Sequence, residues 1–275
     1  MTITTGVLTQ DLRMIVTFNP ISIDEDTPLS SLLEQVYSSG IHHWPVVDQE
    51  NHVIGIVSDT DVVKAGMACL SVDSKHSLTE PVSAFMSDQV LTVDQAACPM
   101  STLKLMLEKR INSLPVVQNN QLQAIVTTSD YIRDYYLINQ NGDTEIIASY
   151  LDRTPVLVDA SQALETARVN CLSEGSDYAV VMQGNCPLGV ISKRDINHYL
   201  CRGIAHSFFE EDIDSEQQVA AVLRESKMLL PTDHLADAAQ IMCDYRLHAV
   251  AIVNHQHEFV GIITQDHLLQ QILDS

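Results

Sequence analysis

The chain has 275 residues, of which 45% are hydrophobic and 19% are charged, a balance typical of a folded globular protein. Fifteen Lys and Arg residues face 36 Asp and Glu residues, and the net charge of −21 excludes a broad basic surface for nucleic acid or anionic lipid. No apolar run approaches the roughly 18 residues of a membrane span, and the N-terminus lacks the pattern of a secretory signal. We therefore expect a cytoplasmic protein of one or two domains that binds neither nucleic acid nor membrane.

A short apolar run that ends in Ser or Thr and leads into a helix pattern occurs four times. The hydroxyl residue stands at Ser58, Thr127, Ser192 and Thr264, at intervals of 69, 65 and 72 residues. A second apolar run precedes each copy, and polar turn residues separate the two runs, which is typical of a β-hairpin. Apolar residues at helical spacing precede each hairpin. The sequence thus predicts four α+β units of about 60 residues, each ordered strand–helix–strand–strand–helix.

The run h-x-x-h-P-V-h, a hairpin and then G-h-h-[ST]-x-x-D at a helix start resemble the CBS domain, named after cystathionine β-synthase. The four repeats, at about 14–70, 80–138, 146–202 and 221–274, resemble the gamma subunit of AMP-activated protein kinase in organisation. The resemblance implies two pseudo-twofold modules, residues 1–140 and 141–275, and association of such modules into a homodimer. Pairing also has a physical reason, because so small a unit leaves an apolar sheet face that must be buried.

The resemblance further implies a regulatory ligand of the adenosine class, such as AMP, ADP, ATP or S-adenosylmethionine, in clefts between paired repeats. The Asp that opens each helix could accept bonds from the two ribose hydroxyls, and the Ser or Thr lies on the same rim. The N-terminus of the helix offers unpaired N–H groups near the phosphates. The expected ribose contacts are Ser58, Asp61, Thr127, Asp130, Ser192 and Asp195.

The base is expected against strand edges of the first two repeats, and the phosphates against basic or imidazole side chains near the motifs. Arg194 is the leading phosphate candidate, because it adjoins both a motif carboxylate and a helix start. The expected base contacts are Ile21, Ser22, Ile41, Pro45, Val46, Leu91, Thr92, Ile111, Pro115 and Val116. The expected phosphate contacts are Arg194, Lys193, Lys109, Arg110 and His43.

The same Ser/Thr-x-x-Asp spacing has a purely structural interpretation, because it matches a capping box in which the carboxylate binds main-chain N–H groups. Ribose contact is favoured for the first two copies, whose partner strands contain a Pro-Val pair. The third copy has Ala179 in place of that proline, and both interpretations stay open there. In the fourth copy His267 occupies the position of the Asp, so we expect a repeat that has lost its ligand site and has only a structural role.

No nucleophile elbow, P-loop or zinc-hydrolase motif accompanies the repeats, so we predict a protein that is not an enzyme. His255 and His257 coincide with the hairpin loops of the other repeats, and no metal site is predicted. The expected function is a regulatory module that binds adenine nucleotide, needs no cofactor and signals its occupancy to an unknown effector protein. Two alternatives stay open: an interaction scaffold whose clefts have lost their ligand, and a sensor of divalent cations.

Overall fold

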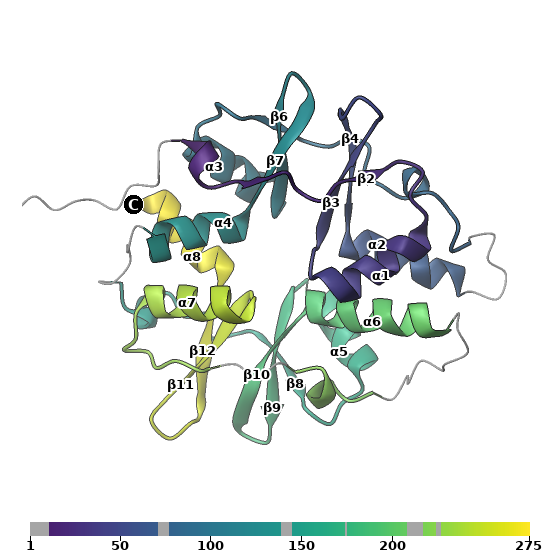
Figure 1. Ribbon diagram of the computed structural model, residues 1–275. Helices are drawn as coiled ribbons and strands as arrows, with labels where there is room; N and C mark the ends of the chain where they lie inside the picture. Colours follow the sequence, from purple (N-terminus) through teal and green to yellow (C-terminus); the bar gives the residue numbers. More distant parts are fainter. Residues whose placement is uncertain (1–10, 71–76, 139–144, 174, 208–216, 224–226) are drawn as a thin grey trace, which may run out of the picture.

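A computed structural model of the protein describes residues 11–70, 77–138, 145–173, 175–207, 217–223 and 227–275. Four copies of one unit are arranged around a common centre (Figure 1). Repeats 1 and 2 occupy the upper half of that view and repeats 3 and 4 the lower half, except that α8 of repeat 4 reaches up beside α4. The chain is therefore built as the sequence predicts, from four α+β units.

Each repeat contributes a β-hairpin and two helices, and the first three add a short strand. Repeat 1 contains β2 (Ile23–Asp24), α1 (Leu29–Ser39), β3 (His43–Val47), β4 (Val53–Ser58) and α2 (Asp59–Cys69). Repeat 2 contains β5 (Val93–Asp94), α3 (Pro99–Lys109), β6 (Ser113–Gln118), β7 (Gln121–Thr127) and α4 (Thr128–Ile132), which continues as a π-helix over Arg133–Ile138.

The second half of the chain repeats this order. Repeat 3 contains β8 (Val156–Asp159), α5 (Leu164–Ser173), β9 (Tyr178–Gln183), β10 (Cys186–Ser192) and α6 (Lys193–Ser207). Repeat 4 contains α7 (Leu235–Tyr245), β11 (Ala249–Val253), β12 (Phe259–Thr264) and α8 (Gln265–Asp274). In place of a first strand, Leu229 forms a single parallel bridge to Ile252.

The register of the four hairpins is the same. In each hairpin the Ser or Thr of the motif, at the end of the second strand, lies opposite the first residue of the first strand. These pairs are His43 with Ser58, Ser113 with Thr127, Tyr178 with Ser192 and Ala249 with Thr264. Since the motif also begins the last helix of each repeat, the register brings the start of the hairpin and the start of that helix together.

Repeats pair within each half of the chain by exchanging strand segments. The strand β1 (Thr17–Phe18), which lies before β2 at the start of repeat 1, pairs with β7 of repeat 2. Conversely, Ser87, which lies before β5 at the start of repeat 2, pairs with Ile56 of repeat 1. In the second half, Asp152, which lies before β8 at the start of repeat 3, pairs with Ile262 of repeat 4. The expected pairing into two pseudo-twofold modules is therefore confirmed, with each module held together by main-chain hydrogen bonds.

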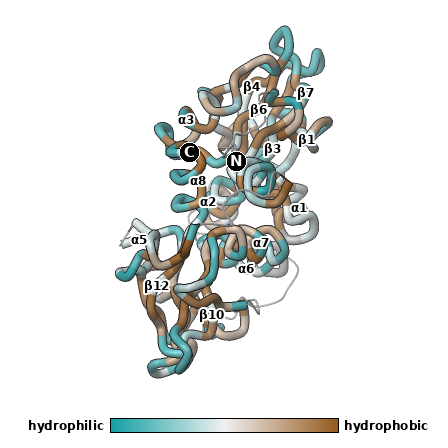
Figure 2. Tube along the Cα trace, turned by 90° about the vertical axis from the view of Figure 1, so that its left-hand side faces the viewer, coloured by the Kyte–Doolittle hydropathy of each residue, from teal (hydrophilic) through white to brown (hydrophobic). Residues whose placement is uncertain are grey.

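The two modules meet through their helices. Figure 2 shows the sheets at opposite ends of the molecule, with α1, α2, α6, α7 and α8 between them. Ile204 of α6 is fully buried in the same apolar core as Leu33 of α1 and Val62 of α2. On the other side, the Tyr136 hydroxyl lies 2.9 Å from Gln271 Oε1 of α8. A single chain thus already packs helices of one module on those of the other, and the homodimer stays a prediction.

The boundary proposed at residues 140 and 141 falls within 139–144, outside the described residues. No helix in the described ranges is both long enough and apolar enough to cross a membrane.

Candidate functional site

The motif carboxylates cap the helices that they open. Asp61 Oδ2 accepts hydrogen bonds from the main-chain N of Ser58 at 3.0 Å and from its hydroxyl at 2.6 Å. Asp130 and Asp195 repeat this arrangement, with main-chain bonds of 2.9 Å in both copies. The structural interpretation of the motif is therefore correct for all three copies. It does not exclude a ligand contact, because these capping bonds use one oxygen of each carboxylate.

In the second repeat the carboxylate also has a cationic partner. Arg133 Nη2 lies 2.6 Å from Asp130 Oδ1, on the oxygen that does not cap the helix. Burial raises the pKa of Asp130 above its ordinary value, although the bonds from Thr127 and Arg133 oppose that change. A ribose that binds this carboxylate must share it with Arg133.

The fourth repeat keeps the cap with a different group. His267 Nδ1 lies 3.1 Å from the main-chain N of Thr264 and accepts a hydrogen bond from it, which requires a neutral imidazole. Burial lowers the pKa of His267 and favours that neutral form. The Tyr178 hydroxyl of repeat 3 also interacts with Thr264 and Asp266 of this motif. These contacts support the expectation that this copy is a structural repeat.

The main cavity lies where the four repeats meet and has a volume of about 480 Å³. Ile41 and His43 line it from repeat 1, Thr127 from repeat 2, Arg194 from repeat 3 and His248 from repeat 4. Its cationic and imidazole side chains are Arg133, Arg194, Arg246, His42, His43 and His248, and the described residues that line it include no Asp or Glu. In a chain with a net charge of −21, this lining forms a local site for anions.

A second cavity of about 220 Å³ adjoins the first and shares His43, Arg194 and His248 with it. The hydroxyl residues of two motifs, Ser58 and Ser192, line this cavity. Its remaining charged residues are Asp59, Asp177, Lys193 and Asp266. The two cavities together connect the motifs of repeats 1, 2 and 3 with the centre of the molecule.

The two central histidines are held in their neutral form. Burial, and to a smaller extent the positive charge of Arg194, lowers the pKa of His43 to about 4. Burial also lowers the pKa of His248 to about 3, again with a contribution from Arg194. Near neutral pH both rings are therefore uncharged, and each can donate one hydrogen bond and accept another.

Hydrogen bonds between buried polar side chains of α2 and α6 connect the two modules beside this cavity. Asp59, at the start of α2, is 7% exposed and lies 3.0 Å from His42 Nδ1. Asn197 of α6 donates to Asp59 Oδ1 at 3.3 Å and to Thr60 Oγ1 at 3.0 Å. Burial acts to raise the pKa of Asp59, but the hydrogen bond and charge of His42 lower it overall. The carboxylate thus stays ionised at a contact between modules.

The structure brings together part of the predicted site. Ile41, His43, Thr127 and Arg194 line the main cavity, and Ser58, Ser192 and Lys193 line the second. The predicted ribose contacts Asp61, Asp130 and Asp195 line neither cavity, and the other predicted base and phosphate contacts lie elsewhere. Four of them are buried within the strands: Pro45, Val46, Pro115 and Val116. Two base contacts, Ser22 and Ile111, are half-buried, and three others, Ile21, Leu91 and Thr92, are exposed. The phosphate candidates Lys109 and Arg110 are exposed and line neither cavity.

Arg246 and His248, which line the cavity from repeat 4, are not among the residues expected from the sequence. Arg246 ends α7 with a φ of 54°, and Arg110 ends α3 with the same φ of 54°. Its guanidinium lies over Gly40, because a Cβ at Gly40 would meet Arg246 Nη1 at 2.7 Å. The equivalence of Arg246 to Arg110 was the available signal, and it was overlooked because the fourth motif lacks its Asp.

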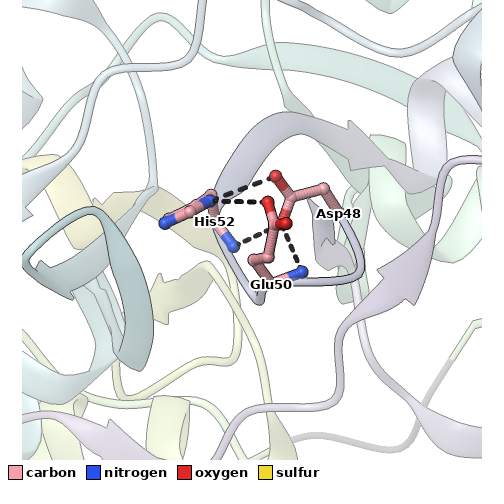
Figure 3. A group of neighbouring side chains, drawn as sticks. All are labelled: Asp48, Glu50 and His52. Carbon is pink, nitrogen blue, oxygen red and sulfur yellow. Dashed lines mark hydrogen bonds and ion pairs between the residues drawn. The ribbon is translucent and has the colours of Figure 1, made fainter.

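A separate group of possible metal ligands lies in the β3–β4 hairpin (Figure 3). His52 Nδ1 is 3.1 Å from Asp48 Oδ2 and 3.7 Å from Glu50 Oε2. Asp48 Oδ1 also accepts the main-chain N–H groups of Glu50 at 2.9 Å and His52 at 2.8 Å. These bonds stabilise a tight turn, and that role explains why the three side chains lie together.

Comparison with known proteins identifies one family over most of the chain. The profile of the CBS domain matches residues 12–68, 82–136 and 219–274, which is more than half of the chain. Repeat 3 lies between the matched stretches and has the same order of elements. An uncharacterized Methanocaldococcus jannaschii protein, MJ1225, is 22% identical over 265 residues, covering 91% of this chain and 94% of the relative.

Solved structures show the same fold. The crystal structure of MJ1225, which is proposed to be an archaeal homologue of γ-AMPK, has a TM-score of 0.77 at 20% identity and covers 95% of this chain and 99% of its own. An uncharacterized conserved protein from Pyrococcus horikoshii has a TM-score of 0.64 at 19% identity, with coverage of 95% and 99%. At these identities the similarity establishes the arrangement of the four repeats.

Proposed function

This chain belongs to the CBS-domain family, and from that premise we propose that it is a non-catalytic regulatory module that binds an adenine nucleotide. The observation that carries the proposal is the central cavity, which Arg133, Arg194 and Arg246 all line in a strongly acidic protein, with Arg133 also paired to Asp130. Guanidinium groups bind phosphate oxygens through paired hydrogen bonds. The cavity therefore selects an anionic ligand in spite of the repelling charge of the whole chain.

The phosphates of the nucleotide occupy the cavity, and the nucleoside extends between repeats 1 and 2. Thr127 stands at the cavity wall, and Asp130 caps the same helix one turn away from it. Ile41 and Ile125 line the same cavity and offer apolar surface for a base. This arrangement is the one that the family resemblance implies.

Signalling follows from the position of the cavity between the modules. His43 belongs to the first module, whereas Arg194 and His248 belong to the second. A phosphate that contacts all three adds a bridge between the modules, and the free energy of binding then favours one relative placement of their helices. We propose that an effector protein recognises that placement.

The cellular location is part of the same proposal. The cysteines whose side chains the structure describes are free thiols, at Cys69, Cys98, Cys186, Cys201 and Cys243. Free thiols support a reducing compartment such as the cytoplasm.

Calorimetric titration of the full chain with AMP, ADP and ATP tests the proposal. We expect at least one nucleotide to bind and to raise the melting temperature, because a ligand that binds only the native state stabilises it. Arg194→Gln should weaken binding, whereas His52→Asn in the exposed β3–β4 hairpin should leave it unchanged. If none of the three nucleotides binds, the protein is better described as an interaction scaffold.

A further inference from the structure

We propose that the central cavity binds its anion together with protons, which His43 and His248 take up as the anion enters, so that occupancy falls as the pH rises. The inference rests on the proposed function, because it concerns the same cavity. It adds a regulatory input, since the protein would respond to pH as well as to the concentration of its ligand.

The geometry places both imidazoles where an anion must lie. His43 is the first residue of β3, directly opposite Ser58, and His248 is the residue before β11. Both histidines line both cavities, and Arg194 at the start of α6 lines them as well. An anion drawn to Arg194 therefore enters the space that the two rings share, at the junction of repeats 1, 3 and 4.

The charges that face the two rings come from several elements. Arg194 of α6 and Asp59 of α2 act on both histidines, and His42 next to β3 does so too. Asp61 of α2 also acts on His43. The rest of the two cavity walls carries Arg133, Arg246, Lys193, Asp177 and Asp266. Without a ligand, the largest influence on the pKa of both rings after burial is the positive charge of Arg194.

The direction of the effect follows from these surroundings. In the free protein the pKa values of His43 and His248 are about 4 and about 3, so neither ring is positively charged near neutral pH. An anion beside Arg194 offsets its positive charge and adds a negative charge next to both rings, which raises both pKa values. The complex then binds more protons than the free protein. By linkage, each proton taken up tightens binding by up to about tenfold for each unit that the pH falls.

Inorganic sulfate is the decisive probe, because its charge does not change in the relevant range, unlike that of a terminal phosphate with a pKa of about 6. We would titrate the full chain with sulfate at about pH 8 and at about pH 6, in buffers of different ionisation enthalpy. The expected result is a several-fold lower Kd at the lower pH, with net uptake of protons. In His43→Asn/His248→Asn the uptake should disappear, and in the control His52→Asn it should persist.

A measurement on the unaltered protein covers the case in which the double variant does not fold. The imidazole resonances of His43 and His248 should titrate at higher pH when sulfate is present. The inference is overturned if sulfate fails to bind, if its affinity is equal or weaker at the lower pH, or if the two resonances do not move. Nucleotide binding without proton uptake would remove this inference alone, whereas the absence of nucleotide binding at every pH would remove the proposed function.

Discussion

Asn197 of α6 and Asp59 of α2 form a hydrogen bond of 3.3 Å between two helices that belong to different modules. Both side chains are buried, and Asp59 is ionised. We expect Asn197→Ala to lower the free energy of unfolding by about 1–3 kcal/mol, because it leaves a buried carboxylate with one partner fewer. Urea unfolding measures the change. Gln240→Ala, which removes an exposed bond to Asp244, is the control and should cost less than 1 kcal/mol, roughly the value of a surface contact.

The packing of α6 on the first module gives a second prediction. Ile204 is fully buried among residues of α1 and α2, so Ile204→Ala should destabilise the protein by about 2–5 kcal/mol through lost contacts and a new cavity. Val169→Ala on α5, where the side chain is 49% exposed, should have a much smaller effect. Equal losses in the two variants would show that the modules do not rely on this interface.

Ribose binding and helix capping can be separated at Asp61. Asp61→Asn retains an oxygen that can accept the N–H of Ser58, so the melting temperature should change little. The same change removes a charged acceptor for a ribose, worth roughly 1.5–3 kcal/mol, which corresponds to an affinity about ten- to a hundredfold weaker. Calorimetry with AMP and ATP measures the affinity.

The matched control for this change is His267→Asn, since the fourth repeat has no Asp at the equivalent position. It should leave nucleotide affinity unchanged while altering only the cap on Thr264. If Asp61→Asn binds nucleotide as the parent does and differs only in melting temperature, the motif is a cap in this protein.

Replacing Arg194 should change the cavity in two measurable ways. Arg194→Gln should weaken nucleotide binding, and it should raise the pKa values of His43 and His248, because the positive charge of Arg194 lowers both. Titration of the imidazole resonances measures the second effect without any ligand. Lys109→Gln, at an exposed position outside both cavities, should produce neither change. A loss of binding in the Lys109 variant would show that Lys109 contacts the ligand after all.

The stability of the ligand-free protein should decline on mild acidification. His43 and His248 have pKa values of about 4 and about 3 in the native state, against an unfolded value of about 6.5. Their contribution is therefore fully present above about pH 6.5 and is lost progressively below it, as the unfolded chain binds protons that the native state does not. Urea unfolding in a buffer free of sulfate and phosphate should show this slope, and His43→Asn/His248→Asn should reduce it.

The sequence by itself determined the four repeats, the order of their elements and the family. Those features depend on local periodicity and on turn residues, which act within a few positions of one another. Ser58 at the end of a strand and Asp61 as a capping residue follow from the same short-range pattern. The sequence also identified Arg194 and His43, because each lies next to a motif.

Only the tertiary structure decided which charged side chains share the cavity. Arg246 and His248 reach the centre from repeat 4, whose motif is incomplete, whereas Arg110 at the equivalent position of repeat 2 is exposed outside both cavities. The physical reason is that the cavity is formed by contacts between modules, which bring together residues from four distant segments. A repeat pattern gives equivalent positions, but the packing of α6 against α1 and α2 and of α7 and α8 against repeat 2 determines which of them face inward.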